Sequence, residues 1–432
     1  MTTLFCDFET RSFKELRGSA SCGLHNYLLD PSTEATILAY KIVNLKVDSS
    51  YDNVNLKVGS VKVWFPLWQE MPDDLKNALD DKQCEIVAFN SCFERGVFRD
   101  VLGWDLPISR FQDPQASGRY LSLPASLEDQ GEILRLPVEL QKDKEGKRLL
   151  DIFTKPTKIK KTGEVYFRDW DSDPEDWAKF VEYAKRDVLA EEALSDVLQS
   201  LGCFPLPPRE RAIWILDQKI NDRGIPVDRK FTQSMFNLGE RAKKDALDEL
   251  NKVTGLENAN SNTQFLKWAQ TQGYSKQTIV KPVVAAELEF NDQLTPLCRK
   301  ALELRQTASS TSYKKMNAIL RLVSPDNRLR NQFVYCGSSK CGRWAGSGFQ
   351  VQNMARPTQE FEDLETVNEA RKMIHQEDYN GIMLRFSSKE KKEEKLKDYG
   401  VVLSTIKSCI RTVFGEEKWV GVSTEDRLKT SV

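Results

Sequence analysis

The sequence contains little histidine and no closely spaced cysteine pair. Only His25 and His375 are present, and the nine cysteines include no C-x-x-C pair. This argues against a structural zinc site and against histidine-dependent catalysis. We interpret the cysteines as reduced core thiols of a cytoplasmic protein. We therefore expect carboxylates to carry any chemistry.

Long apolar segments and an excess of charge are also missing. No run approaches the roughly 18 apolar residues of a membrane span, and the N-terminus MTTLFCDFET has acids where a secretory signal has basic residues. The 63 Lys and Arg against 64 Asp and Glu give a net charge of -1, so any nucleic-acid site must be a local basic patch. The 432 residues, 40% hydrophobic and 29% charged, are typical of a globular protein of about three domains.

The first part of the chain combines strand patterns with a later helical one. β-rich runs at residues 3–9, 35–45 and 61–65 precede a run at 85–89, which leads into a helical pattern at 91–101. This order predicts an α/β sheet with an antiparallel start.

A long helix is predicted over residues 172–198. Asp173 can cap it, Pro174 suits the first helical position, and an apolar stripe comes next. The stripe consists of Trp177, Val181, Ala184 and Val188. The segment GCFPLPP at residues 202–208 ends the helix and indicates a domain boundary.

Helical patterns dominate the chain beyond this boundary. They cover residues 210–222, 229–253 and 291–322, and predict an all-α segment. Residues 328–357 are rich in Gly, Ser, Gln and aromatics, which predicts a hairpin and an irregular stretch. The interleaved Lys and Glu of residues 389–397 indicate a solvated helix face.

Asp7 and Glu9 are the first candidates for a chemical role. Side chains two apart in a strand project to the same face, so these carboxylates stand side by side while Cys6 and Phe8 turn the other way. Adjacent carboxylates repel each other unless a cation lies between them. An isolated D-x-E pattern is nevertheless most often an acidic edge strand that faces water.

Two further patterns are equally ambiguous when taken alone. Asn90 lies at a strand-to-helix junction as a possible cap, and Glu94 follows one turn later. Tyr183 and Asp187 are spaced i, i+4 on the long helix and therefore share a face. Each pattern alone is as well explained by ordinary structure.

The order of the three patterns changes this interpretation. D-x-E, N-x-x-x-F-[D/E] and Y-x-x-x-D, in this order, resemble the signature of DEDD-type 3′–5′ exonucleases, and specifically the proofreading domain of bacteriophage-type family A DNA polymerases. The surrounding sequence is similar as well: LFCDFETRS, HNYLLDPSTEATILAYKI, LPASLEDQGEILRLPVELQKDKEGKRLL and WAKFVEYAKRDVLAEEAL. The resemblance implies an α/β, RNase H-like exonuclease domain over residues 1–204.

The same resemblance implies roles for the motif residues. Asp7, Glu9, Glu94 and Asp187 would be metal ligands, and Tyr183 would orient the attacking water. Phosphodiester hydrolysis needs a water of lowered pKa and a stabilised leaving oxygen, which two Mg²⁺ or Mn²⁺ ions about 3.5–4 Å apart supply. Such hard cations prefer oxygen ligands.

Asn90 is implied as a DNA contact, and Glu94 departs from the usual pattern. The wider superfamily usually has Asp at the position of Glu94, and the extra methylene moves the carboxylate by about a bond length. Either this branch tolerates Glu, or the second metal binds poorly and the domain is a DNA-binding relic. The rest of the motif set is intact, which favours an active site.

A basic segment lies between the second and third motifs. Residues 141–164 contain eight Lys and Arg against four acids. The segment is interpreted equally well as a site for backbone phosphates and as a solvated loop.

The later segments resemble the mainly α-helical thumb and the start of the palm of the same polymerases. The thumb resemblance, over residues 205–325, implies that Ser312, Lys314 and Lys315 contact the duplex backbone. VYCGSSKCGRWAGSGFQVQNMARP, within residues 326–432, resembles the start of the palm. There Arg343, Gln352 and Asn353 would contact the minor groove, whose acceptors are nearly the same for all base pairs.

The resemblance stops near Val422, before the carboxylates that hold the polymerase metals. We interpret this as an incomplete palm and expect no primer extension by this chain alone. A gene split between two chains, an interrupted reading frame and a degenerate fragment all remain open as origins.

We expect a two-metal 3′–5′ exonuclease in the cytoplasm of a bacterial host cell. Its partners would be the single-stranded 3′ end and primer–template duplex of DNA, with no membrane. The alternatives are a non-catalytic DNA-binding subunit, half of a split polymerase completed by a second chain with palm and fingers, and an unrelated hydrolase.

Overall fold

The computed structural model describes most of the chain in two compact units. The described residues are 2–18, 20–44, 59–140, 144–158, 163–311, 313–338, 340–354, 361, 363–393 and 397–414. Unit 1 contains residues 1–224 and 330–350, and unit 2 contains residues 225–329 and 351–432. The division by function that the resemblance implies, at residues 204 and 325, stays a prediction.

Unit 1 is built on a five-stranded mixed sheet of order β3-β2-β1-β4-β5. The strands are β1 (Thr2–Arg11), β2 (Glu34–Asn44), β3 (Lys62–Trp64), β4 (Glu85–Val87) and β5 (Phe111–Gln112). The first three pair antiparallel, whereas β4 is parallel to β1 and β5 is parallel to β4. The predicted α/β sheet with an antiparallel start is confirmed.

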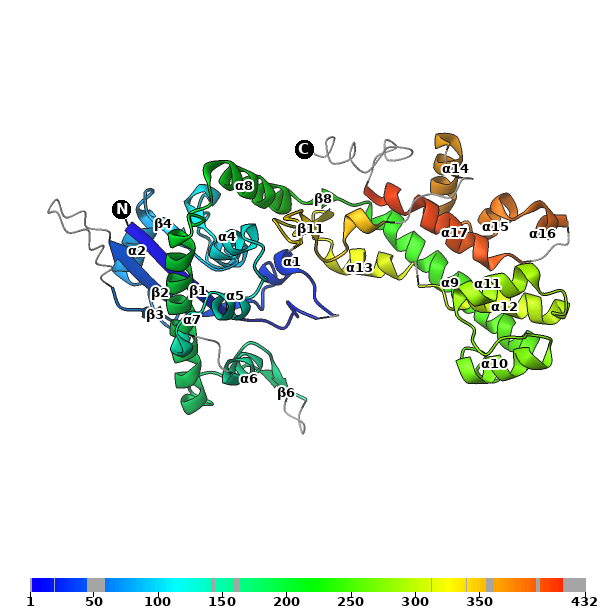
Figure 1. The fold of residues 1–432 in the computed structure, drawn as a ribbon, viewed down its shortest axis with the longest axis horizontal. Coiled ribbons are helices and arrows are strands. Elements are labelled where there is room, and N and C mark those ends of the chain that lie inside the picture. Colours follow the sequence, from blue (N-terminus) through cyan, green and yellow to red (C-terminus); the bar gives the residue numbers. More distant parts are fainter. Residues whose placement is uncertain are drawn as a thin grey trace. The chain divides into compact units, whose positions relative to one another are not determined.

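Helices cover both faces of this sheet (Figure 1). They are α1 (Leu24–Leu28), α2 (Asp73–Asp80), α3 (Cys92–Gly96), η1 (Val97–Val101), η2 (Ile108–Arg110), α4 (Pro114–Tyr120), α5 (Leu127–Ile133), η3 (Val138–Leu140), α6 (Lys144–Phe153), α7 (Pro174–Ser200) and α8 (Pro208–Arg223). A short hairpin of β6 (Thr157–Lys158) and β7 (Val165–Tyr166) lies between α6 and α7. The long helix predicted over residues 172–198 is confirmed as α7.

Alternation along β1 divides the core of unit 1 into two layers. Leu4, Cys6 and Phe8 pack in one hydrophobic cluster with α2, α3 and η1. Phe5 packs in the other with α6 and α7. Because side chains two apart share a face, Asp7 and Glu9 lie on the same side of the sheet as Phe5 and α7.

The chain leaves unit 1 after α8 and returns to it in the hairpin of β10 (Phe333–Val334) and β11 (Ala345–Gly346). The side chain of Asn221 on α8 forms two hydrogen bonds with the backbone of this hairpin. It accepts the backbone N–H of Phe333 at 3.0 Å and donates to the carbonyl of Phe333 at 2.9 Å. The hairpin predicted within residues 328–357 is thus confirmed.

Unit 2 is mainly helical. Its helices are α9 (Arg229–Thr254), α10 (Asn262–Thr271), α11 (Lys281–Phe290), α12 (Pro296–Ala308), α13 (Lys314–Leu322), α14 (Leu364–His375), α15 (Tyr379–Phe386), α16 (Lys389–Glu393) and α17 (Tyr399–Cys409), with the 3-10 turns η4 (Val351–Asn353) and η6 (Ile410–Phe414) and the strand pair β8 (Ile225–Pro226) and β9 (Arg328–Leu329). Helices α12, α13, α14 and α17 all pack on α9. The packing is close at Gly239, where a Cβ would lie 2.6 Å from the ring of Tyr313.

Three local predictions were wrong in detail. The helical pattern over residues 291–322 is interrupted, because α12 ends at Ala308 and Ser309, Ser310 and Thr311 precede α13. Hydroxyl side chains of this kind compete with helical hydrogen bonds. All nine cysteines are free thiols, but Cys341 is exposed and therefore not a core residue. Asn90 is not a helix cap, because Ser91 takes that position.

Among the described helices, none combines the length and apolar character needed to cross a bilayer.

Candidate carboxylate site

Two carboxylates of the candidate site project from the centre of the sheet. Asp7 pairs across strands with Ala39, and Glu9 with Ile37, both of which belong to the hydrophobic layer under α7. A register shift between Glu9 and Thr10 marks a bulge directly after Glu9. Bulges re-aim the adjacent side chains and are common beside active sites. Glu9 is 7% exposed, so it is not the water-facing acid of an edge strand.

Glu94 reaches the site from a turn that two buried carboxylates hold. The turn follows β4, and Asn90 has a left-handed φ of 66° there. The carboxylate of Asp113 accepts the backbone N–H groups of Asn90 at 3.0 Å and Ser91 at 3.2 Å, and Glu191 accepts that of Phe89 at 3.0 Å. Helix α3 then begins at Cys92 and buries Glu94 to 2% exposure.

Helix α7 supplies three polar side chains on one face. Tyr183, Asp187 and Glu191 are spaced i, i+4 and i+8, which places them one above the other. The phenol of Tyr183 is hydrogen-bonded to the Asp187 carboxylate, and both burial and that carboxylate raise the pKa of Tyr183. The ring packs against Gly146 of α6, where a Cβ would overlap ring carbon Cε2. Only glycine therefore lets α6 approach the phenol so closely.

The electrostatics show that the acids share one environment. Burial raises the pKa of Glu94 well above its ordinary value, and the nearby carboxylates of Asp7 and Glu9 raise it further. Burial likewise raises the pKa of Glu191, with additional contributions from Asp7, Glu94 and Asp187. The structure thus brings the predicted acids Asp7, Glu9, Glu94 and Asp187 together with Tyr183.

The side chains of the site carry the oxygen atoms that divalent cations prefer as ligands, although they are not arranged as a metal site. Within the described part of the chain, no group of three or more His, Cys, Asp or Glu side chains is arranged as a metal site. However, the Oε2 atoms of Glu94 and Glu191 are buried and have no hydrogen-bond partner among the described residues. Buried carboxylate oxygens without partners are costly, and oxygen ligands are the ones that Mg²⁺ and Mn²⁺ prefer. The oxygen donors therefore suit, in their chemistry, the metals that the resemblance implies.

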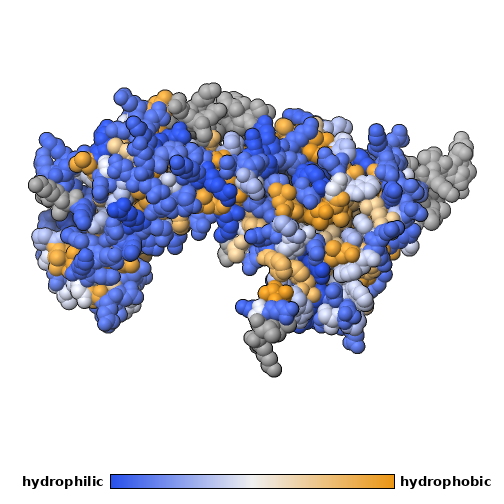
Figure 2. Space-filling view, turned by 180° about the vertical axis from the view of Figure 1, so that it is seen from behind, coloured by the Kyte–Doolittle hydropathy of each residue, from blue (hydrophilic) through white to orange (hydrophobic). Residues whose placement is uncertain are grey.

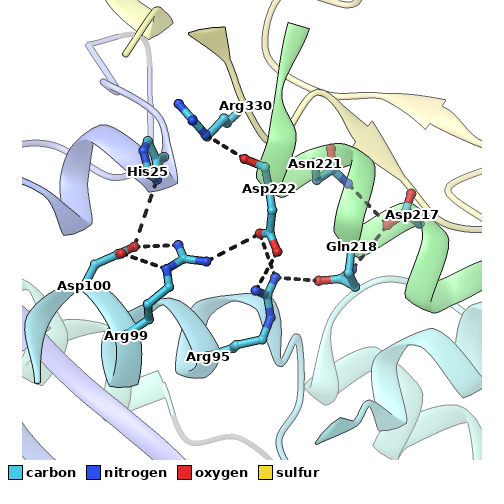
Figure 3. Close-up of polar contacts among 9 residues, drawn as sticks. All are labelled: His25, Arg95, Arg99, Asp100, Asp217, Gln218, Asn221, Asp222 and Arg330. Atoms are coloured by element: carbon cyan, nitrogen blue, oxygen red, sulfur yellow. Dashed lines mark hydrogen bonds and ion pairs between the residues drawn. The ribbon is translucent and has the colours of Figure 1, made fainter. Parts of the chain in front are cut away.

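A separate ionic network anchors the helix that carries Glu94 (Figure 3). Arg95 on α3 forms a bidentate pair with the carboxylate of Asp222 on α8, with distances of 2.7 and 2.8 Å. Arg99, in the π-helical turn η1, pairs with Asp100 at 2.7 Å and lies 3.8 Å from Asp222. Arg330 donates to the backbone carbonyl of Asp222 at 2.7 Å. The acids of this network are thus matched by arginines, and the network ties α3 and η1 to the end of α8.

The residues predicted to contact DNA are distributed over both units. In unit 1, Asn90 and Arg343 are exposed. In unit 2, Lys314 and Lys315 are exposed on the first turn of α13, and the ammonium group of Lys315 donates to the backbone carbonyl of Asn353 at 3.2 Å. Ser312 and the side chain of Gln352 lie outside the described residues. Their contacts with DNA stay predictions.

The basic segment at residues 141–164 is only partly described, and some of its cations are paired. Arg148 forms two hydrogen bonds with Asp176, at 2.7 and 2.9 Å, and one with Glu145 at 3.0 Å. Lys155 pairs with Asp151. Arg148 and Lys155 thus already have acidic partners, and whether the segment binds phosphates stays a prediction.

Sequence reasoning missed Glu191. The signal was present, because Glu191 continues the i, i+4 spacing of Tyr183 and Asp187 by one more turn. Its partner Phe89 is 102 residues earlier in the chain, so only the folded structure shows where the carboxylate points.

Comparison with known proteins agrees with the motifs. The chain is 30% identical over 415 residues to a DNA polymerase of Bacillus phage SP02, a match that covers 96% of this chain and 58% of that protein. The chain is a homologue of a bacteriophage DNA polymerase. The resemblance to a bacteriophage DNA polymerase, drawn from the motifs, is thereby confirmed. The chain spans less than two thirds of the length of this curated relative.

Other comparisons add less. No family model matches the chain. Among solved structures, the chain is similar to the POL domain of Pol1 from M. smegmatis in a complex with DNA primer–template and dNTP. That similarity has a TM-score of 0.48 with 13% identity, and it covers 92% of this chain and 73% of the other.

Proposed function

We propose that unit 1 contains a metal-dependent 3′–5′ DNA exonuclease of the RNase H-like type, which proofreads within a DNA polymerase. The observation that carries this proposal is that acids of β1, α3 and α7 lie close enough to influence one another: Asp7 and Glu9 act on the buried Glu94, and Tyr183 is hydrogen-bonded to Asp187. These residues come from one strand and two helices that are far apart in sequence. Placing several acids close to one another is costly unless something offsets their repulsion.

Asp7, Glu9, Glu94 and Asp187 would hold two Mg²⁺ or Mn²⁺ ions. Bound divalent cations lower the pKa of a water nucleophile and stabilise the leaving 3′ oxygen. The chain's own contribution is orientation. Tyr183, held by Asp187 and by the packing of its ring against Gly146, would fix the attacking water.

An aromatic surface at the end of β1 supports a single-stranded substrate. Phe13, 55% exposed, stacks on Phe167 with a ring-centroid distance of 4.8 Å. The guanidinium of Arg11 lies over the rings of Phe167 and Trp68, at 5.0 and 5.7 Å. Hydrophobic residues gather on the visible face of unit 1, in the right half of Figure 2. Exposed aromatic rings beside a cation suit stacking of unpaired bases, which is tolerant of sequence.

Duplex DNA is the second proposed partner, because the homologous phage protein is a DNA polymerase. Lys314 and Lys315 would contact the backbone of the duplex, and Arg343, Gln352 and Asn353 its minor groove. The exposed lysine pair on α13 supports the first of these contacts.

The test is degradation of a 5′-labelled single strand with Mg²⁺ or Mn²⁺ and with EDTA. The parent should shorten the strand from its 3′ end only with metal, and Asp7→Asn should lower the rate about a hundredfold or more. Glu182→Gln is the matched control, because Glu182 is an exposed acid on α7 that pairs with Lys185 at 2.7 Å. A parent that binds DNA but does not degrade it would indicate the DNA-binding alternative.

A further inference from the structure

Glu191 is a buried carboxylate that the four proposed ligand positions leave without a role. Its side chain lies on α7 one turn after Asp187 and is 1% exposed. One oxygen, Oε1, accepts the backbone N–H of Phe89 at 3.0 Å. The other, Oε2, is buried without a hydrogen-bond partner among the described residues.

The contact with Phe89 does not by itself require a carboxylate. An amide oxygen accepts a backbone N–H equally well, and it would avoid the cost of burying a charge. The groups that face Glu191 make this cost larger. Asp7 from β1, Glu94 from α3 and Asp187 from α7 are all acids, and the Phe89 N–H is the favourable contact.

We propose that Glu191 is a fifth carboxylate of the site, which strengthens the binding of divalent cations while holding the turn that leads to Glu94. This inference rests on the proposed metal-dependent function. A cation at the site offsets the repulsion among Asp7, Glu94 and Glu191, and the extra negative charge then favours the metal-bound state. Oε2 is buried without a hydrogen-bond partner among the described residues, and Asp7 and Glu94 exert the largest charge effects on the Glu191 carboxylate.

Binding of Mn²⁺ to the full chain, measured by isothermal titration calorimetry without DNA, tests the role of the charge. Glu191→Gln keeps an acceptor for Phe89 and removes the charge, so its Mn²⁺ affinity should fall roughly tenfold. Glu191→Asp keeps the charge and shortens the side chain, so its affinity should stay within about threefold of the parent. Metal-free thermal unfolding of the Gln variant should match or exceed that of the parent.

Glu287→Gln provides the matched control. Glu287 is a buried glutamate of unit 2 that also accepts a backbone N–H, from Ser275 at 3.1 Å. Its replacement should leave Mn²⁺ affinity unchanged.

Two results would overturn the inference in distinguishable ways. If Glu191→Gln binds Mn²⁺ as tightly as the parent while Asp7→Asn does not, Glu191 is only a backbone acceptor and the proposed nuclease function stands. If the parent shows no saturable Mn²⁺ binding, or Asp7→Asn binds as the parent does, the proposed function fails and this inference fails with it.

Discussion

Unit 1 contains two groups of acids that differ in their partners. In the network of Figure 3, Asp222 and Asp100 face Arg95 and Arg99 at ion-pair distances. In the carboxylate site, Glu94 and Glu191 each keep a buried oxygen without a hydrogen-bond partner in the described structure, and burial, followed by nearby acids, raises the pKa of both.

This difference indicates that the network of Figure 3 is a structural anchor, whereas the carboxylate site is suited to bind a ligand. The ion pairs hold α3 and η1 against α8. Removal of one partner should therefore destabilise the folded protein. Acids that lack a cationic partner repel one another, so the fold bears a cost that protonation or a bound cation relieves. Substitution of an acid should therefore have opposite effects on stability in the two groups.

The largest expected effect is on activity in the carboxylate site. Asp187→Asn should lower the rate of strand degradation about a hundredfold or more. The metal-free stability should be unchanged or rise by up to about 1 kcal/mol, because one of the mutually repelling charges is removed. An amide oxygen can still accept from Tyr183. Nuclease assays and urea unfolding in EDTA measure the two effects, and a clear loss of stability would contradict the comparison.

The network should respond in the opposite direction. Asp222→Ala leaves Arg95, which is 6% exposed, without its carboxylate partner, and should destabilise unit 1 by about 3 kcal/mol. Urea unfolding measures this loss. Glu182→Ala is the control, because Glu182 pairs with Lys185 at an exposed position and should cost less than about 1 kcal/mol. Equal losses for the two variants would show that the network is not an anchor.

Asp217, a further buried acid of unit 1, allows a test through the pH dependence of stability. Burial raises the pKa of Asp217 to about 7 from an ordinary value of 3.8, although Asn221 and Gln218 donate to it. Because the folded state holds the proton more tightly, this group contributes stability below about pH 4 that is lost as the pH rises through about 7. The size of the pKa shift limits the contribution of Asp217 to the free energy of unfolding to about 4 kcal/mol. We expect about half of that value.

Unfolding of Asp217→Asn between pH 4 and 8 measures this contribution. The variant should lose less stability than the parent over that range. The same slope in both proteins would assign the pH dependence to other groups.

The smallest expected effect concerns the aromatic surface. Phe13→Ala removes one ring of the stacked pair and should weaken single-strand binding about fivefold, or roughly 1 kcal/mol. Fluorescence anisotropy with a labelled single strand in Ca²⁺ measures it. Val138→Ala is the control, because Val138 is 79% exposed and lies elsewhere in unit 1. Equal affinities for both variants would exclude Phe13 from the binding surface.

Local patterns in the sequence were sufficient for most of the elements and for the candidate acids. Period-two alternation placed Asp7 and Glu9 on one strand face, and period 3.6 placed Tyr183 beside Asp187. These are properties of neighbouring residues, so no knowledge of the fold was needed. The order of the motifs then led to the resemblance.

Features that depend on distant residues were not accessible in this way. Glu191 binds Phe89 across 102 residues, and Arg95 binds Asp222 across 127. Whether a buried acid is matched by a cation is decided by such contacts. The left-handed Asn90 also escaped prediction, because Asp113 fixes its turn from the end of the next strand.

The discontinuity of unit 1 has a consequence for the order in which the protein can mature during synthesis. Residues 225–329 emerge before the segment 330–350, which unit 1 needs for its hairpin. Tyr335 and Cys336 from that segment belong to the same hydrophobic cluster as Leu4 and Trp214. The sheet that carries Asp7 can therefore form early on the ribosome, but its outer layer closes only after about a hundred later residues have been made.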